Sequence, residues 1–135
     1  YEKNKVKSVG IEELIKKSDV VTLHLPLDDS TKNIMNEERL QMLKSSAILI
    51  NLARGGLIDE AILKKMLLEK RIAGAALDVF EIEPPTDKEF LTMDNVFITP
   101  HIGASTEEAI IAMGMAAIDG LDNAKDPLEF ISFKG

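Results

Sequence analysis

Four short segments in which most residues are apolar or β-branched recur along the chain, at residues 19–25, 47–52, 72–79 and 95–99. Strands with little alternation between apolar and polar positions are typical of sheets that are buried on both faces, and such sheets are mostly parallel. The pattern therefore predicts four strands of one parallel sheet, covered on both sides.

The segments between and after these strands carry helix signals. The expected helices start at Ile11 behind the N-cap Gly10, and at the N-caps Asn36, Asp59 and Ser105. The last helix reaches about residue 123 and is apolar nearly all round at 109–118, so we expect it to be buried against the sheet and a neighbouring domain or subunit. Residues 80–94 are expected to form a polar loop. Alternating strands and helices predict an α/β fold with flanking helices.

Composition and charge exclude several classes of protein. A chain of 135 residues, 45% of them apolar, is long enough for one domain with its own core. The net charge of −7 argues against a nucleic-acid binder. The absence of cysteine fits a reducing cytoplasm, and with only two histidines no metal-site spacing occurs. No apolar run approaches the roughly 18 residues of a membrane span. A small molecule is the expected partner.

The residues that follow the strands carry the candidate chemistry. In open parallel sheets, ligands bind beyond the carboxyl ends of the strands. The stretches found there are 24–26, 53–55, Asp78 with its loop to Glu83, and 101–103. Together they bring one arginine, two histidines and two acids to one rim, which predicts acid–base chemistry on a small carboxylate.

The three strongest candidates each have an ordinary alternative. Arg54 either pairs with a surface acid or binds a carboxylate ligand, and the adjoining Gly55-Gly56 favours the ligand. His101 either satisfies backbone groups before a helix or acts as a general acid–base. Glu83 either is a solvated loop acid or hydrogen-bonds His101 and fixes its tautomer.

Two further polar residues lie on the same rim. Asp78 ends a strand of small residues, where a buried carboxylate either caps backbone amides or binds a polar group of a ligand. His24 is expected to be a satisfied core or rim histidine. No glycine-rich phosphate loop and no dinucleotide fingerprint occurs in the 135 residues. The residues by themselves thus predict an acid–base rim and no particular cofactor.

Four motifs in this order resemble the D-isomer-specific 2-hydroxyacid dehydrogenases over about residues 11–120. They are His24-Leu25-Pro26-Leu27, Asn51-Leu52-Ala53-Arg54-Gly55-Gly56, Ala75-Ala76-Leu77-Asp78-Val79-Phe80 through Glu83-Pro84, and Thr99-Pro100-His101-Ile102-Gly103. Within that family, residues 101–106 and Glu83-Pro84-Pro85 look most like the phosphoglycerate dehydrogenase branch.

The resemblance implies the second half of a Rossmann-type parallel sheet, NAD as cofactor, and hydride transfer between NAD and a small D-2-hydroxy acid. Arg54 matches the arginine that binds the substrate carboxylate and carbonyl. His101 matches the acid–base that takes the hydroxyl proton, and Glu83 matches its carboxylate partner. Asp78 matches the residue that holds the nicotinamide carboxamide. Positions that border the cofactor, mainly through backbone, are matched by Leu25, Pro26, Leu52, Ala53, Gly103, and also by Arg54 and His101.

The chain also departs from the family pattern, because the glycine-rich first half of the sheet and its acidic ribose-binding residue are not in the sequence. We therefore expect residues 1–123 to be the C-terminal part of a dinucleotide-binding domain, and residues 124–135 to lead toward a substrate domain. Alone, the chain is expected to be inactive and to bind NAD weakly, since the pyrophosphate site is absent. The choice of NAD over NADP depends on the absent acidic position.

The expected substrate is 3-phosphoglycerate, as in serine biosynthesis, and three alternatives stay open. One is a glyoxylate or hydroxypyruvate reductase of the same family, and another is a corepressor-like module that senses nucleotides. The third is a structural fragment without activity. The presence of Arg54, Glu83 and His101 favours catalysis. The resemblance also implies a cytoplasmic homodimer formed through the nucleotide-binding domain, with a 2-hydroxy or 2-oxo acid as the small-molecule partner.

Overall fold

The computed structural model describes residues 6–124. The chain divides between His101 and Ile102 into two compact units. The first unit holds a sheet and its helices, and the second holds α5 (Glu107–Asp122). Apart from Ala124, the tail expected at 124–135 lies outside the described residues.

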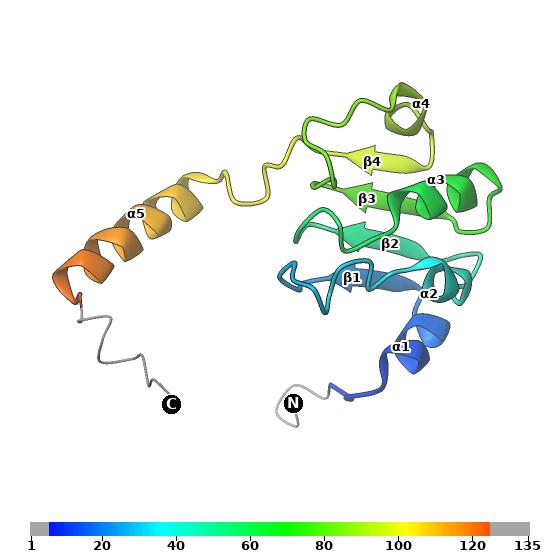
Figure 1. Ribbon diagram of the computed structural model, residues 1–135, viewed down its shortest axis with the longest axis horizontal. Coiled ribbons are helices and arrows are strands. Elements are labelled where there is room, and N and C mark those ends of the chain that lie inside the picture. The colour runs from blue at the N-terminus through cyan, green and yellow to red at the C-terminus, as the bar shows by residue number, and fades with distance from the viewer. Residues whose placement is uncertain (1–5, 125–135) are drawn as a thin grey trace, which may run out of the picture. The chain divides into compact units, whose positions relative to one another are not determined.

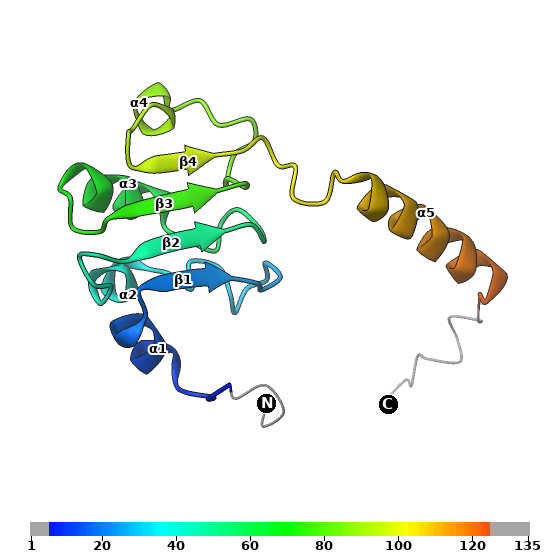
Figure 2. The same ribbon diagram turned by 180° about the vertical axis from the view of Figure 1, so that it is seen from behind.

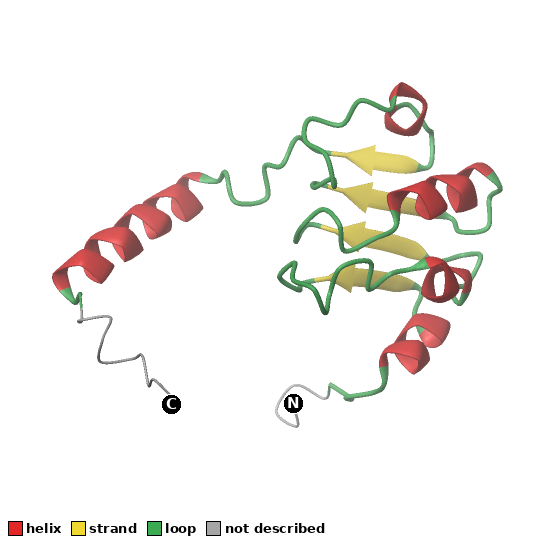
Figure 3. Ribbon diagram, viewed as in Figure 1, coloured by secondary structure: helices red, strands yellow, loops and turns green. Residues whose placement is uncertain are grey.

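The first unit is built on a parallel sheet of four strands in the order β1-β2-β3-β4. The strands are β1 (Val20–Leu23), β2 (Ile48–Asn51), β3 (Gly74–Leu77) and β4 (Val96–Ile98). Each lies inside a segment predicted to be a strand, and the predicted parallel pairing is confirmed. All four arrowheads point to the same edge of the sheet (Figure 3), so the loops that follow the strands share one rim.

Three helices cover one face of this sheet, in front of it in Figure 1 and behind it in Figure 2. They are α1 (Ile11–Lys17), α2 (Glu37–Gln41) and α3 (Glu60–Leu68). The core between the sheet and these helices includes Val21, Leu49, Leu77, Leu40, Leu63 and Leu67. Burial of each such side chain stabilises the fold by about 1.5–3 kcal/mol.

The opposite face of the sheet is not buried within this unit, so the prediction that both faces are buried is wrong here. Val20, Ile48 and Phe97 on that face are exposed among the described residues. The reason is that α1, α2 and α3 all pack on the other side. Only one face of the sheet therefore contributes to the core of this unit.

The predicted N-caps of α2 and α3 are confirmed. The side chain of Asn36 accepts a hydrogen bond from the Arg39 N–H, and that of Asp59 accepts one from the Ile62 N–H. Each bond satisfies one of the backbone donors that a helix start leaves without a helical partner. The cap of α3 is important for the site, because this helix begins on the rim beyond β2.

Two helix predictions are wrong in detail. The segment 80–94 is not all loop, because it contains α4 (Lys88–Leu91), which Asp87 caps by accepting from the Phe90 N–H. A single turn is too short to show helical periodicity in a sequence. The long helix α5 is capped by Thr106, which accepts from the Ala109 N–H, and not by Ser105.

The second unit contains α5, in which no residue is buried. Ile110, Ile111 and Met113 are among its exposed apolar side chains. Its burial against the sheet and a neighbouring domain or subunit stays a prediction. No helix of the described part is long and apolar enough to cross a membrane.

Candidate active site

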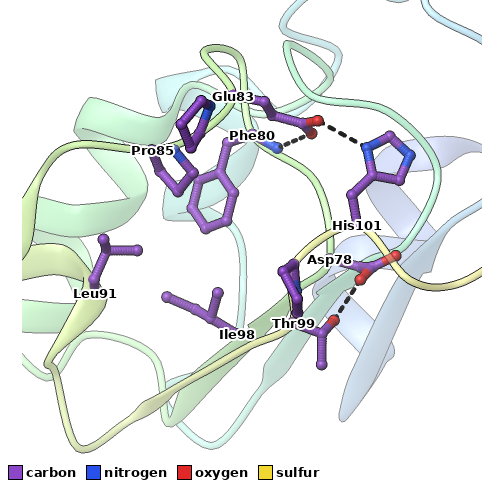
Figure 4. A pocket seen from close by; sticks show the side chains of 10 residues that line it. Asp78, Phe80, Glu83, Pro85, Leu91, Ile98, Thr99 and His101 are labelled. Atoms are coloured by element: carbon purple, nitrogen blue, oxygen red, sulfur yellow. Dashed lines mark hydrogen bonds and ion pairs between the residues drawn. The ribbon is translucent and has the colours of Figure 1, made fainter.

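A histidine and a glutamate meet on the rim beyond the strands. His101 Nδ1 lies 2.8 Å from Glu83 Oε2 (Figure 4). The second carboxylate oxygen, Oε1, accepts a hydrogen bond of 3.0 Å from the Phe80 N–H. The structure thus makes the contact that the sequence led us to expect, although the roles of the two residues stay predictions.

The contact determines which nitrogen of His101 is available for chemistry. An ionised carboxylate only accepts hydrogen bonds, so the Nδ1 that faces Glu83 is assigned the proton. In the neutral ring, Nε2 is then left as the acceptor. The hydrogen bond from His101, followed by that from the Phe80 N–H, lowers the pKa of Glu83. Because of this lowered pKa, Glu83 stays ionised to a lower pH than an ordinary glutamate, and it remains an acceptor for the His101 Nδ1–H.

The backbone of His101 has an unusual conformation. Its φ of 54° lies in the left-handed region, which residues other than glycine seldom adopt. Such conformations cost about 1–3 kcal/mol and are concentrated at functional sites. The side chains of His101 and Glu83 are 50% and 38% exposed, so both are within reach of a ligand.

Asp78 follows β3 and is 2% exposed. Its Oδ1 accepts a hydrogen bond of 2.5 Å from the Thr99 hydroxyl, which follows β4 (Figure 4). Its own N–H donates to the carbonyl oxygen of Asn51, at 3.0 Å. The bond from a threonine hydroxyl was not among the alternatives that the sequence left open, because it depends on the alignment of two strand ends.

Asn51 has a structural role that the sequence did not predict. It ends β2, is 2% exposed, and uses both ends of its amide to hold the next turn. Nδ2 donates to the Arg54 carbonyl oxygen at 2.8 Å, and Oδ1 accepts from the Ala53 N–H at 3.1 Å. A polar residue closing an apolar strand was the available signal. Asn51 fixes the backbone that carries Arg54.

The side chain of Arg54 is not part of the Glu83–His101 contact in the described structure. Its Nη1 donates to the neighbouring Ala53 carbonyl oxygen at 2.7 Å, and the residue is exposed. Arg54 and its expected partners, Glu83 and His101, therefore lie on the same rim, but the Arg54 side chain makes no hydrogen bond or ion pair with either of them among the described residues. A guanidinium bonded to one carbonyl retains further donors for a carboxylate.

The turn after Arg54 lies directly against the loop that carries Glu83. A Cβ atom built on Gly55 would lie 2.6 Å from the Glu81 nitrogen and closer still to the carbonyl group of Phe80. Only glycine allows this approach of two backbones. The next residue, Gly56, has a φ of 77° and turns the chain toward α3.

A cavity of about 530 Å³ opens beside these residues. Its polar side is formed by Asp78, Thr99, Glu83 and His101, and its apolar side by Phe80, Pro84, Pro85, Leu91, Ile98 and Pro100 (Figure 4). Arg54 is not among the described residues that line it. The cavity thus combines a buried acid, a hydrogen-bonded histidine–glutamate pair and apolar walls.

A family model described as "D-isomer specific 2-hydroxyacid dehydrogenase, NAD binding domain" matches residues 1–103. The chain belongs to this family. The match covers the whole first unit and therefore every strand and every residue of the Glu83–His101 contact.

Individual members of the family support this assignment. The chain is 51% identical over 118 residues to D-3-phosphoglycerate dehydrogenase of Methanocaldococcus jannaschii, covering 83% of this chain and 22% of that protein. It is 44% identical over 117 residues to hydroxypyruvate reductase of Thermotoga maritima, covering 84% and 38%. A solved glyoxylate reductase from Paecilomyes thermophila superposes with a TM-score of 0.82 at 36% identity, covering 86% and 35%. The chain spans less than half the length of these dehydrogenases.

The rim residues fit the nicotinamide end of the NAD that this family binds. Asp78 offers a buried carboxylate, which suits a carboxamide donor. Leu25, Pro26 and Leu52 are exposed on the rim, and Ala53 is half-buried there. Gly103, also expected to border the cofactor, belongs to the second unit. No glycine-rich turn for the pyrophosphate occurs in the sequence.

Proposed function

We propose that the chain contributes the acid–base pair and the substrate-binding arginine of a D-2-hydroxyacid dehydrogenase that acts on 3-phosphoglycerate. The observation that carries the proposal is the 2.8 Å contact between His101 Nδ1 and Glu83 Oε2 beside the buried Asp78. This arrangement combines a proton acceptor, the group that orients it, and an acceptor for a carboxamide within one cavity.

Bound NAD would supply the acceptor for the hydride of the substrate. His101 takes the proton of the 2-hydroxyl group at Nε2, while its Nδ1–H stays hydrogen-bonded to Glu83. In the reverse direction, the protonated imidazole returns that proton to the carbonyl oxygen, and the carboxylate of Glu83 favours the charged ring. Arg54 binds the substrate carboxylate and stabilises the charge that develops on the substrate.

A chimera tests the proposal, because the chain spans only 22% of the Methanocaldococcus dehydrogenase. The chain replaces the matching segment of that enzyme, and NADH formation from 3-phosphoglycerate is measured. His101→Gln is expected to lower kcat by about 10²–10⁴-fold, the usual contribution of a positioned acid–base. His24→Gln alters the other histidine and serves as the matched control. Near-normal turnover by the His101→Gln chimera would refute the proposed role.

Glyoxylate or hydroxypyruvate reduction is the second candidate. It is supported by the 44% identity to the Thermotoga hydroxypyruvate reductase and by the glyoxylate reductase fold match. The same chimera distinguishes the candidates, since kcat/KM for 3-phosphoglycerate, hydroxypyruvate and glyoxylate can be compared in one protein. Higher kcat/KM for either 2-oxo acid than for the phosphorylated substrate would favour the reductase.

A further inference from the structure

The loop 80–83 must hold Glu83 in place although its far end faces solvent. The loop starts at Phe80, whose buried ring makes an edge-to-face contact with Phe90 at a centroid distance of 6.2 Å. Two residues later Ile82 is 72% exposed, and the Glu83 side chain is 38% exposed. Packing therefore anchors the start of the loop, and its far end depends on hydrogen bonds.

One of these bonds comes from a residue that the proposed reaction does not use. Glu60, the first residue of α3, accepts a hydrogen bond from the Glu81 N–H at 2.7 Å. Hydrogen bonds to an ionised acceptor are stronger than neutral ones. Glu60 stands on a helix whose start is capped by Asp59, and its carboxylate supports the backbone between Phe80 and Glu83 at the Glu81 N–H.

The placement of Glu60 is electrostatically unfavourable. Burial raises the pKa of Glu60, and the nearby negative charges of Glu81 and Glu83 raise it further, while the hydrogen bond from the Glu81 N–H opposes them. A carboxylate at this position thus repels Glu83 through space but supports the Glu83 loop through its backbone. These two effects on Glu83 have opposite signs and can be measured separately.

We propose that Glu60 is a positioning residue, which holds the backbone of loop 80–83 through the Glu81 N–H and so places Glu83 against His101. This inference rests on the proposed function only in taking Glu83 and His101 as the proton-transfer pair. Glu60 itself makes no contact with His101 in the interactions found for the described chain.

The test follows the titration of Glu83 by carbon NMR of the 135-residue chain, together with hydrogen exchange of the Glu81 amide. Glu60→Ala removes the acceptor, so the loop loosens, the Glu83 pKa rises, and the Glu81 amide exchanges about tenfold or more faster. Glu60→Gln retains an acceptor oxygen without the charge, so the Glu83 pKa should not rise, and the Glu81 amide should exchange more slowly than in Glu60→Ala. Glu60→Asp retains the charge on a shorter side chain, and we expect the same two changes in it as in Glu60→Ala. It serves as the substitute if Glu60→Ala does not fold.

A charge effect alone gives the opposite sign, because removing a neighbouring negative charge lowers the Glu83 pKa in both Glu60→Ala and Glu60→Gln. A Glu83 pKa that falls or stays constant in Glu60→Ala would therefore overturn the inference. Glu37→Ala, at the first position of α2, is the matched control and should leave Glu83 unchanged. His101→Gln should raise the Glu83 pKa; no rise there would overturn the Glu83–His101 pair itself and this inference with it.

Discussion

A methyl group added at Gly55 should strongly destabilise the contact between the two loops that form the site. In Gly55→Ala the new Cβ would lie 2.6 Å from the Glu81 nitrogen and closer to the Phe80 carbonyl carbon and oxygen. All three neighbours are backbone atoms, so no side-chain rotation relieves the clash. The substitution must push apart the turn after β2 and the loop after β3.

The size of the effect follows from the kind of atoms involved. Overpacking by a methyl group costs about 1–3 kcal/mol where side chains give way, and a backbone clash lies at or above the upper end. We therefore expect Gly55→Ala to lower the free energy of unfolding by at least about 3 kcal/mol. With a urea m-value of roughly 1.5 kcal/mol/M, the midpoint moves by roughly 2 M.

Two other glycines provide a graded comparison. Gly56→Ala meets only the Leu27 side chain at 3.4 Å, but its φ of 77° costs about 1–2 kcal/mol. Gly114→Ala has nothing within 4 Å and should be neutral or slightly stabilising in its helix. Urea unfolding followed by circular dichroism measures all three variants. A Gly55→Ala midpoint equal to or above that of Gly56→Ala would show that the two loops are not in the contact described.

Three further outcomes are expected. The lowered pKa of Glu83 means that its ionised form contributes stability above the ordinary value of 4.5, and this contribution is lost as the pH falls through the lower folded-state pKa. The urea midpoint of Glu83→Gln should accordingly change less with pH than that of the parent chain, when both are measured as the pH falls below 4.5. Asn51→Asp removes the donor to the Arg54 carbonyl and buries a charge, so the free energy of unfolding at pH 7 should fall by about 2–4 kcal/mol. Part of that loss should be recovered at pH 3, where the protonated acid can donate a hydrogen bond. Titration calorimetry of NAD with this chain alone should give no sub-millimolar affinity, and a Kd below 1 mM would contradict the need for a glycine-rich turn.

The parts of the fold that depend on local sequence were predicted well. The four strands and their parallel pairing follow from apolar runs separated by crossover helices. The caps at Asn36 and Asp59 depend on a hydrogen bond to a residue three positions away. The order of residues on the rim follows from strand polarity, so Glu83 and His101 could be expected on the same edge.

The contacts that shape the site could not be predicted in the same way. Glu60 and Glu81 are 21 residues apart, as are Asp78 and Thr99, and each contact depends on how distant segments of the chain meet. The glycine pair after Arg54 signalled a close approach, but nothing in the sequence names Phe80 as the neighbour. The direction of the Arg54 side chain was also beyond prediction, since an exposed guanidinium has many rotamers.

The links among the loops beyond the strands form a series of contacts that ends at the Glu83–His101 pair. The Asn51 carbonyl holds the Asp78 N–H, Gly55 admits the Phe80 carbonyl, and Asp78 accepts from the Thr99 hydroxyl two residues before His101. Each link joins the loop of one strand to the loop of the next, so the Glu83–His101 geometry is determined by β2, β3 and β4. The Arg54 backbone is part of this network through Asn51, whereas its guanidinium is bonded only to the adjacent carbonyl among the described contacts. For the reaction that we propose, it follows that the Glu83–His101 pair is pre-organised within this chain, whereas Arg54 would bind a substrate carboxylate through the guanidinium donors that the Ala53 carbonyl leaves available.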